Sequence, residues 1–175
     1  MGTTGFSREA WVAAALARYE RPLLRYAAGI THDLECARDV VQDTFLKLCE
    51  ADPARVDDHL APWLYTVCRN RALSVRQKEA RMTPLDDHES ATASPPSDAA
   101  ERNETHARVR AVLDTLPEDS REAFRLKFRD GLTYREIGEV MGVSLGTVSN
   151  LITGALNTLR RELRPELNPA REVQS

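Results

Sequence analysis

Apolar residues recur every three to four positions over most of the chain, which is the spacing of amphipathic helices. The clearest stripe predicts a helix from about Asp33 to Glu50 and consists of Leu34, Ala37, Val41, Phe45 and Leu48. Similar patterns predict helices over residues 7–19, 22–29 and 62–81, with Ser7 as an N-cap and prolines at two of the starts. The sequence therefore predicts an all-α fold.

The periodicity disappears between residue 83 and about residue 105, in a stretch rich in Pro, Ser, Thr, Asp and Ala. This composition is typical of a flexible linker. We therefore expect two small helical domains, residues 1–82 and 105–164, joined by a linker at 83–104 and followed by a tail at 165–175. The second domain should contain helices at about 105–116 and from 118 to Gly131, followed by a helix pair.

The helix pair lies between Thr133 and about Leu163. Thr133 and Glu136 have the spacing of a capping box, Gly142 can end the first helix in a left-handed conformation, and Ser144 can cap the second. Gly138 is small where the two helices should approach closely. The positions expected to be buried between them are Ile137, Met141, Val143, Val148 and Leu151. This pattern predicts a helix-turn-helix, which places its second helix in a DNA major groove.

The net charge of −3 is unusual for a DNA-binding protein, but the charge is unevenly distributed. Residues 33–58 contain three basic and eight acidic residues, a net charge of −5. Residues 61–81 contain five basic residues and one acidic residue, a net charge of +4. An acidic helix followed by a basic helix indicates two different partners for two faces of the first domain.

Three segments resemble the extracytoplasmic-function sigma factors of bacteria: DVVQDTFLKLCE from Asp39, APWLYTVCRNRAL from Ala61, and LPEDSREAFRLKFRDGLTYREIGEVMGVSLGTV from Leu116. They occur in the order of that family, with a linker between the second and third. The resemblance implies a first domain that docks on core RNA polymerase and melts the minus-ten promoter element. It implies a second domain that reads the minus-thirty-five element. It also adds an anti-sigma factor, held between the two domains, as a candidate partner.

The resemblance gives roles to two faces of the first domain. One face of the third predicted helix should bind the clamp helices of the largest polymerase subunit, because an acidic face with an exposed leucine suits a basic helical partner; it comprises Asp39, Gln42, Asp43 and Leu46. The face of the fourth helix opposite its apolar stripe should bind the minus-ten element; it comprises Tyr65, Arg69, Asn70, Arg76 and Gln77. Asn70 matches the family asparagine that reads a flipped base, and the loop from Asp52 to Leu60 should complete that pocket.

The second helix of the helix-turn-helix departs from the family pattern, because residues 144–158 carry no charge. The residues expected at the minus-thirty-five element are Arg135, Thr147, Ser149, Asn150 and Thr153. An amide such as Asn150 can read adenine, and hydroxyl groups can contact phosphates or base edges. The ionic contribution to DNA binding should be small, so tethering to polymerase should supply much of the effective concentration.

The sequence gives no indication of an enzyme. It has no glycine-rich phosphate loop, no GxSxG and no HExxH, so we expect no cofactor and no small-molecule substrate. His32 and Cys36 are too few for a metal site, and no apolar run approaches the length of a membrane span. Three cysteines without CxxC spacing favour buried thiols in a reducing cytoplasm.

Two alternatives remain open from the sequence. A conventional helix-turn-helix regulator would bind operator DNA as a dimer without serving as a polymerase subunit, and the second domain alone would fit it. A protein-interaction adaptor without DNA reading would explain the charge-free helix.

Overall fold

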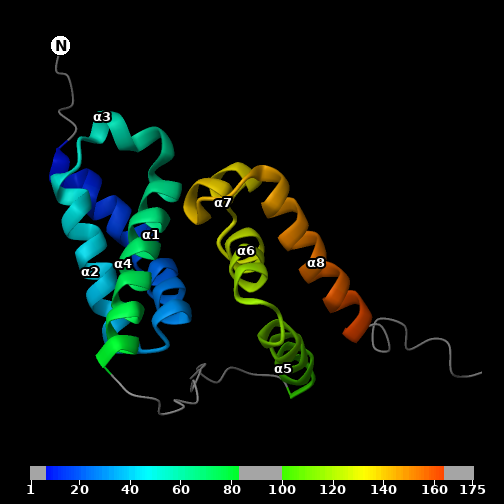
Figure 1. Ribbon diagram of the computed structural model, residues 1–175. Coiled ribbons are helices and arrows are strands. Elements are labelled where there is room, and N and C mark those ends of the chain that lie inside the picture. Colours follow the sequence, from blue (N-terminus) through cyan, green and yellow to red (C-terminus); the bar gives the residue numbers. More distant parts are fainter. Residues whose placement is uncertain (1–6, 83–99, 164–175) are drawn as a thin grey trace, which may run out of the picture. The chain divides into compact units, whose positions relative to one another are not determined.

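The computed structural model describes residues 7–82 and 100–163. All regular secondary structure within these ranges is helical (Figure 1). The helices belong to two compact units. The first contains α1 to α4, and the second contains α5, α6, most of α7, and α8. Most of the predicted linker, 83–99, and the predicted tail, 165–175, lie outside the described residues. The predicted all-α fold with two helical units is confirmed.

Helix α1 (Arg8–Thr31) is a single helix, so the predicted ends near Tyr19 and at Gly29 are wrong. Pro22 lies inside it and removes one backbone hydrogen bond, at a cost of roughly 3 kcal/mol. Burial on both sides of the proline offsets this cost. The buried residues are Trp11, Ala15, Leu23, Tyr26, Ala27, Ile30 and Thr31. The helix ends at His32, whose φ of 58° provides the left-handed C-cap.

Helix α2 (Leu34–Glu50) begins where the sequence predicted, because the side chain of Asp33 accepts a hydrogen bond from the backbone N–H of Cys36 at 2.6 Å. This bond lowers the pKa of Asp33. Leu34 was expected in the core but is 49% exposed. It lies in the first turn, and Val40 and Thr44 are buried further along the helix.

The connection after α2 contains helix α3 (Pro53–Val56) and a 3-10 turn, η1 (Asp57–His59), where the sequence predicted a loop. Helix α4 (Leu60–Met82) follows directly. Each of α1, α2 and α4 packs against the other two, and Figure 1 shows them side by side. Because α4 contacts two neighbours, its buried face is broad and comprises Pro62, Leu64, Tyr65, Cys68 and Ala72. Val67 and Val75 of α4 are half-buried.

In the second unit, α8 (Leu145–Leu163) packs against α5 (Ala100–Asp114) and α6 (Glu118–Phe128). Helix α5 begins five residues before the predicted boundary and ends at Asp114, because Leu116 and Pro117 form the turn to α6. Phe128 is 54% exposed, and its ring lies tilted against that of Phe124 with centroids 4.5 Å apart. Helix α7 (Tyr134–Met141) completes the unit.

The helix-turn-helix forms as the sequence predicted. The capping box between Thr133 and Glu136 is complete, and Gly142 has a φ of 69°. Ser144 accepts a hydrogen bond from the backbone N–H of Thr147 at 3.1 Å, which caps α8. Val143 and Leu151, however, are only half-buried, and Ile152 takes the core position beside Val148.

Gly138 marks a close approach of backbone to backbone. A Cβ at this position would lie 2.9 Å from the carbonyl oxygen of Val143. Gly138→Ala should therefore lower the free energy of unfolding by roughly 1–3 kcal/mol, because the turn must shift. Gly154→Ala is the matched control, since a Cβ there meets nothing within 4 Å, and it should raise stability by up to about 1 kcal/mol. Urea unfolding followed by circular dichroism measures both, and equal effects would contradict the assigned close approach.

Candidate polymerase and nucleic-acid interfaces

The outward side of α2 displays the residues that the sequence singled out there. Asp39 and Gln42 are exposed, and Leu46 is 55% exposed, whereas Asp43 is half-buried. These residues are accessible because α2 packs against both α1 and α4 with its other sides, which leaves one polar strip of the helix facing outward. The strip combines carboxylates, an amide and one large apolar side chain, which is the chemistry of a surface for a basic helical partner.

Asp43 forms an ion pair with Arg71 of α4, and the Oδ2 and Nε atoms are 2.6 Å apart. Both side chains are partly exposed, at 38% and 47%, so the pair adds at most about 1 kcal/mol to stability. It does, however, hold the Asp43 carboxylate in one orientation beside α4. The sequence interpretation missed Arg71, and only its place in the basic block at 61–81 could have indicated it.

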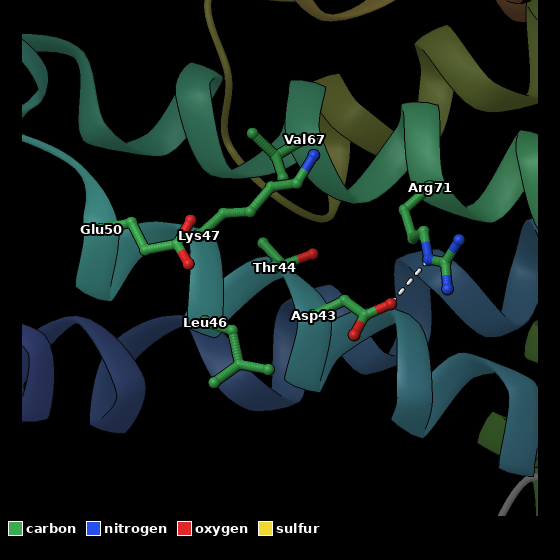
Figure 2. Close-up of a pocket in the computed structure, with 7 residues that line it drawn as sticks. All are labelled: Asp43, Thr44, Leu46, Lys47, Glu50, Val67 and Arg71. Carbon is green, nitrogen blue, oxygen red and sulfur yellow. Dashed lines mark hydrogen bonds and ion pairs between the residues drawn. The ribbon is translucent and has the colours of Figure 1, made fainter.

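A groove of about 350 Å³ lies between α2 and α4 next to this ion pair (Figure 2). Its lining is Asp43, Thr44, Leu46, Lys47, Glu50, Val67 and Arg71. In Figure 2, Leu46 points away from Arg71, and the Lys47 side chain extends toward Val67. The groove therefore offers a mixed apolar and charged rim that side chains of a docked helix can contact.

The residues predicted to bind the minus-ten element do not share one exposed face of α4. Asn70 and Gln77 are exposed and lie seven residues apart, on the same side of the helix. Arg69 and Arg76 are half-buried on a flank of α4, and both interact with other residues. The amide groups are thus the outermost of the set, while the two guanidinium groups border them.

Tyr65 was placed on that exposed face, and this prediction is wrong. Tyr65 is 2% exposed, and its ring packs edge-on against Tyr26 of α1 with centroids 5.1 Å apart. The periodicity argument assumed a narrow buried stripe on α4. Contact with both α1 and α2 widens the buried face enough to include Tyr65, which therefore stabilises the core of the first unit.

The helix-turn-helix presents most of its predicted DNA-contact residues to solvent. Arg135 on α7 and Thr147, Asn150 and Thr153 on α8 are exposed, whereas Ser149 is half-buried. The Thr147 and Ser144 hydroxyl oxygens are 2.9 Å apart, so the Thr147 side chain takes part in the cap of α8. The side of α8 opposite its buried residues is polar and uncharged until Arg160.

The three cysteines are free thiols in different surroundings. Within residues 7–82 and 100–163, no group of three His, Cys, Asp or Glu side chains is placed to bind a metal ion. The thiol of Cys36 donates a hydrogen bond to the Glu79 carboxylate at 2.9 Å, which raises the pKa of Cys36 to about 12. Burial raises the pKa of Cys68 to about 12 as well.

These pKa values predict which thiol reacts. A thiol with a pKa near 12 is about one part in ten thousand thiolate at pH 8, so iodoacetamide should modify exposed Cys49 first and Cys36 and Cys68 slowly. Glu79→Gln should accelerate modification of Cys36 alone. Peptide mass spectrometry measures the rates of modification, and equal labelling of Cys36 and Cys49 would contradict the assigned hydrogen bond.

The raised pKa of Cys36 also makes the stability of the protein depend on pH. Because this pKa is above the ordinary 9.0, the contribution of Cys36 to stability is present below pH 9 and is lost between pH 9 and 12.

The fold and these surfaces define a DNA-binding transcription protein of the helix-turn-helix class. Two family models match the chain: Sigma-70 region 2 over residues 15–82 and Sigma-70 region 4 over residues 106–159. The RNA polymerase sigma-H factor of Pseudomonas aeruginosa is 30% identical over 166 residues, covering 87% of this chain and 86% of that protein. The ECF RNA polymerase sigma factor RpoE of Cereibacter sphaeroides is 32% identical over 130 residues, covering 74% and 71%.

Two solved structures have the same fold. The sigma factor RpoE in complex with the anti-sigma factor NepR, from Bartonella quintana, matches with a TM-score of 0.62 and 23% identity, covering 88% of this chain and 97% of that chain. CnrH in complex with the cytosolic domain of CnrY matches with a TM-score of 0.60 and 25% identity, covering 90% of each.

The chain therefore belongs to the extracytoplasmic-function family of RNA polymerase sigma factors. As such it directs core RNA polymerase to specific promoters and initiates transcription. This supports the sigma-factor interpretation of the sequence and not the conventional regulator. Within the described residues, none of the helices combines the length and the apolar character that crossing a membrane requires.

Proposed function

We propose that the first unit divides its tasks between neighbouring helices. Asp39, Gln42, Asp43 and Leu46 of α2 bind the clamp helices of core RNA polymerase, and the α4 face centred on Asn70 binds the separated strands of the minus-ten element. The observation that carries this proposal is the exposure of an acidic strip on α2 beside an exposed amide pair, Asn70 and Gln77, on the adjacent basic helix. An amide can donate to and accept from one base edge, which suits reading of an unstacked base.

The connection between α2 and α4 completes the pocket in which the Asn70 face binds an unstacked base. It runs directly into the first turn of α4, and most of its side chains are exposed. Carboxylates repel phosphates but accept hydrogen bonds from base amino groups, so its acidic residues suit bases better than the backbone of DNA.

The second unit reads the minus-thirty-five element through α8. Asn150 and Thr153 are exposed on α8 and contact base edges, while Arg135 and the Ser144–Thr147 cap lie next to the phosphates. Ser149, which is half-buried, contributes from the flank of α8. Because α8 brings no charge before Arg160, this unit binds DNA weakly by itself and depends on tethering to polymerase.

The protein works in the cytoplasm as a binding subunit without catalytic activity of its own, and it dissociates from polymerase after initiation. An anti-sigma factor is a further partner. The solved relatives support this, since one was determined with the anti-sigma factor NepR and the other with the cytosolic domain of CnrY. In this proposal the functional boundaries follow the predicted domains, with residues 1–82 acting at the minus-ten element and 105–164 at the minus-thirty-five element.

Run-off transcription with core polymerase on genomic fragments tests the proposed function. We expect discrete transcripts only when the protein is added, and their start sites identify the promoter. Gel filtration separates the alternatives: co-elution with core polymerase supports the proposal. A stable dimer that does not associate with polymerase, together with the absence of any transcript, would overturn it.

A further inference from the structure

The connection between α2 and α4 is anchored from a distant part of the chain. Only Val56 among residues 52–59 is buried, at 5% exposure, and the rest of this stretch consists of one helical turn and one 3-10 turn. Asp52 caps α3 by accepting a hydrogen bond from the backbone N–H of Ala54 at 3.1 Å. Such a local bond orders the turn itself but does not determine where the turn lies against the helices.

The first turn of α1 determines where the connection lies. The indole N–H of Trp11 donates a hydrogen bond to Asp57 Oδ1 at 2.8 Å, across 46 positions of sequence. The guanidinium group of Arg8 donates to the backbone carbonyl of Ala51, at the C-cap of α2. The two bonds hold the connection near its beginning and its end.

The Trp11 indole ring does not need this bond in order to be buried. Trp11 is 4% exposed, whereas Asp57 is exposed. The ring could be buried equally well if its N–H donated to any other acceptor, or to water, at the rim of the core. Because the acceptor is the side chain of Asp57 on η1, the hydrogen bond links the buried Trp11 to the exposed connection.

We propose that Trp11 is a positioning residue for promoter opening. Through Asp57 it fixes the connection against α1, so that residues 52–59 are positioned for the unstacked base that the Asn70 face binds in the proposed function. This inference rests on the proposed function of the first unit. Recognition surfaces need their parts placed within about 0.5 Å. Apart from Val56, the side chains of residues 52–59 are not buried, so the Trp11–Asp57 bond supplies a further fixed point for the connection.

The experiment compares three variants at positions 57 and 58 with Trp11→Phe and the Trp11→Phe/Asp57→Ala double variant, all in the full chain. Asp57→Ala removes the acceptor, and Asp57→Asn removes the same charge but keeps an oxygen that can accept from Trp11. Asp58→Ala is the matched control, because it removes the neighbouring exposed carboxylate and leaves the Trp11 bond in place. Hydrogen exchange of the amides of residues 54–60 is measured in the free protein, and open-complex formation is measured with core polymerase on a promoter from the run-off assay.

For Asp57→Ala we expect exchange at residues 54–60 to be about 3- to 10-fold faster and open-complex formation to be slower by a similar factor, with polymerase affinity unchanged. Asp57→Asn should restore exchange to near the parent value, and Trp11→Phe should accelerate exchange without a further increase in the Trp11→Phe/Asp57→Ala double variant. Asp58→Ala should leave exchange unchanged.

Two results would overturn the inference alone. The first is unchanged exchange in Asp57→Ala, which would show that the bond does not position the connection. The second is faster exchange with normal opening, while Asn70→Ala still impairs opening. If Asp57→Ala and Asn70→Ala both opened promoters normally, the proposed function of α4 would fail and this inference with it.

Discussion

Replacing Asp39 and Asp43 of α2 with arginine is expected to abolish association with core RNA polymerase. The change puts two positive charges on a surface that, in the proposed function, meets basic clamp helices, and juxtaposed like charges cost several kcal/mol. We therefore expect polymerase affinity to fall at least about 100-fold, measured by fluorescence anisotropy of labelled protein. Circular dichroism should still show a folded helical protein, because Asp39 is exposed and Asp43 is only half-buried.

The ion pair with Arg71 provides a control for the Asp43 part of this variant. Arginine at position 43 would also repel Arg71, so a loss of binding could come from a disturbed α4. The exchanged pair Asp43→Arg/Arg71→Asp restores attraction within the protein but still presents a positive charge on α2. A second control, Glu9→Arg/Glu20→Arg, makes the same net charge change on exposed positions of α1. Wild-type affinity in the Asp39→Arg/Asp43→Arg variant would refute the assignment of this surface.

Replacing Asn70 with alanine is expected to impair promoter opening and to leave polymerase binding intact. A bidentate amide–base interaction contributes about 1–3 kcal/mol of discrimination, so opening should be about 5- to 150-fold slower. The variant should not lose stability, because Asn70 is exposed and alanine is the better helix former. Permanganate reactivity of unpaired thymines follows opening directly.

Ser74→Ala is the matched control for Asn70→Ala. Ser74 is exposed one turn further along α4 on a similar side of the helix, and the substitution also removes a polar group. It should open promoters at nearly the wild-type rate. If the two variants behaved alike, or if Asn70→Ala opened promoters normally, Asn70 would have no particular role in reading the minus-ten element.

Local signals in the sequence predicted the helix-turn-helix almost completely. The capping box at Thr133, the left-handed Gly142 and the Ser144 cap each involve residues within four positions of one another, so their hydrogen bonds can be inferred from spacing alone. Gly138 could also be interpreted correctly, because the turn that approaches it is only five residues away. The start of α2 near Asp33 was predicted from periodicity, and in the structure a local cap of the same kind holds it.

Predictions failed where contacts between distant segments outweighed local preferences. Pro22 and Gly29 are strong local breakers, yet α1 continues through both because its buried residues on either side pack against α2 and α4. Tyr65 was misplaced because the number of neighbours around α4 cannot be read from its periodicity. Leu34 was assigned to the core by periodicity, although the first turn of α2 leaves it exposed.

By itself, the sequence determined the all-α class, the two helical units, the family and the charged character of α2 and α4, since these depend on composition, helical period and local caps. Only the tertiary structure decided which side chains on those helices face outward, that Asp43 pairs with Arg71, and that Trp11 is hydrogen-bonded to Asp57. Those contacts join residues 28 and 46 positions apart. Their geometry arises when three helices bury their apolar faces together, and no periodicity within one helix can specify it.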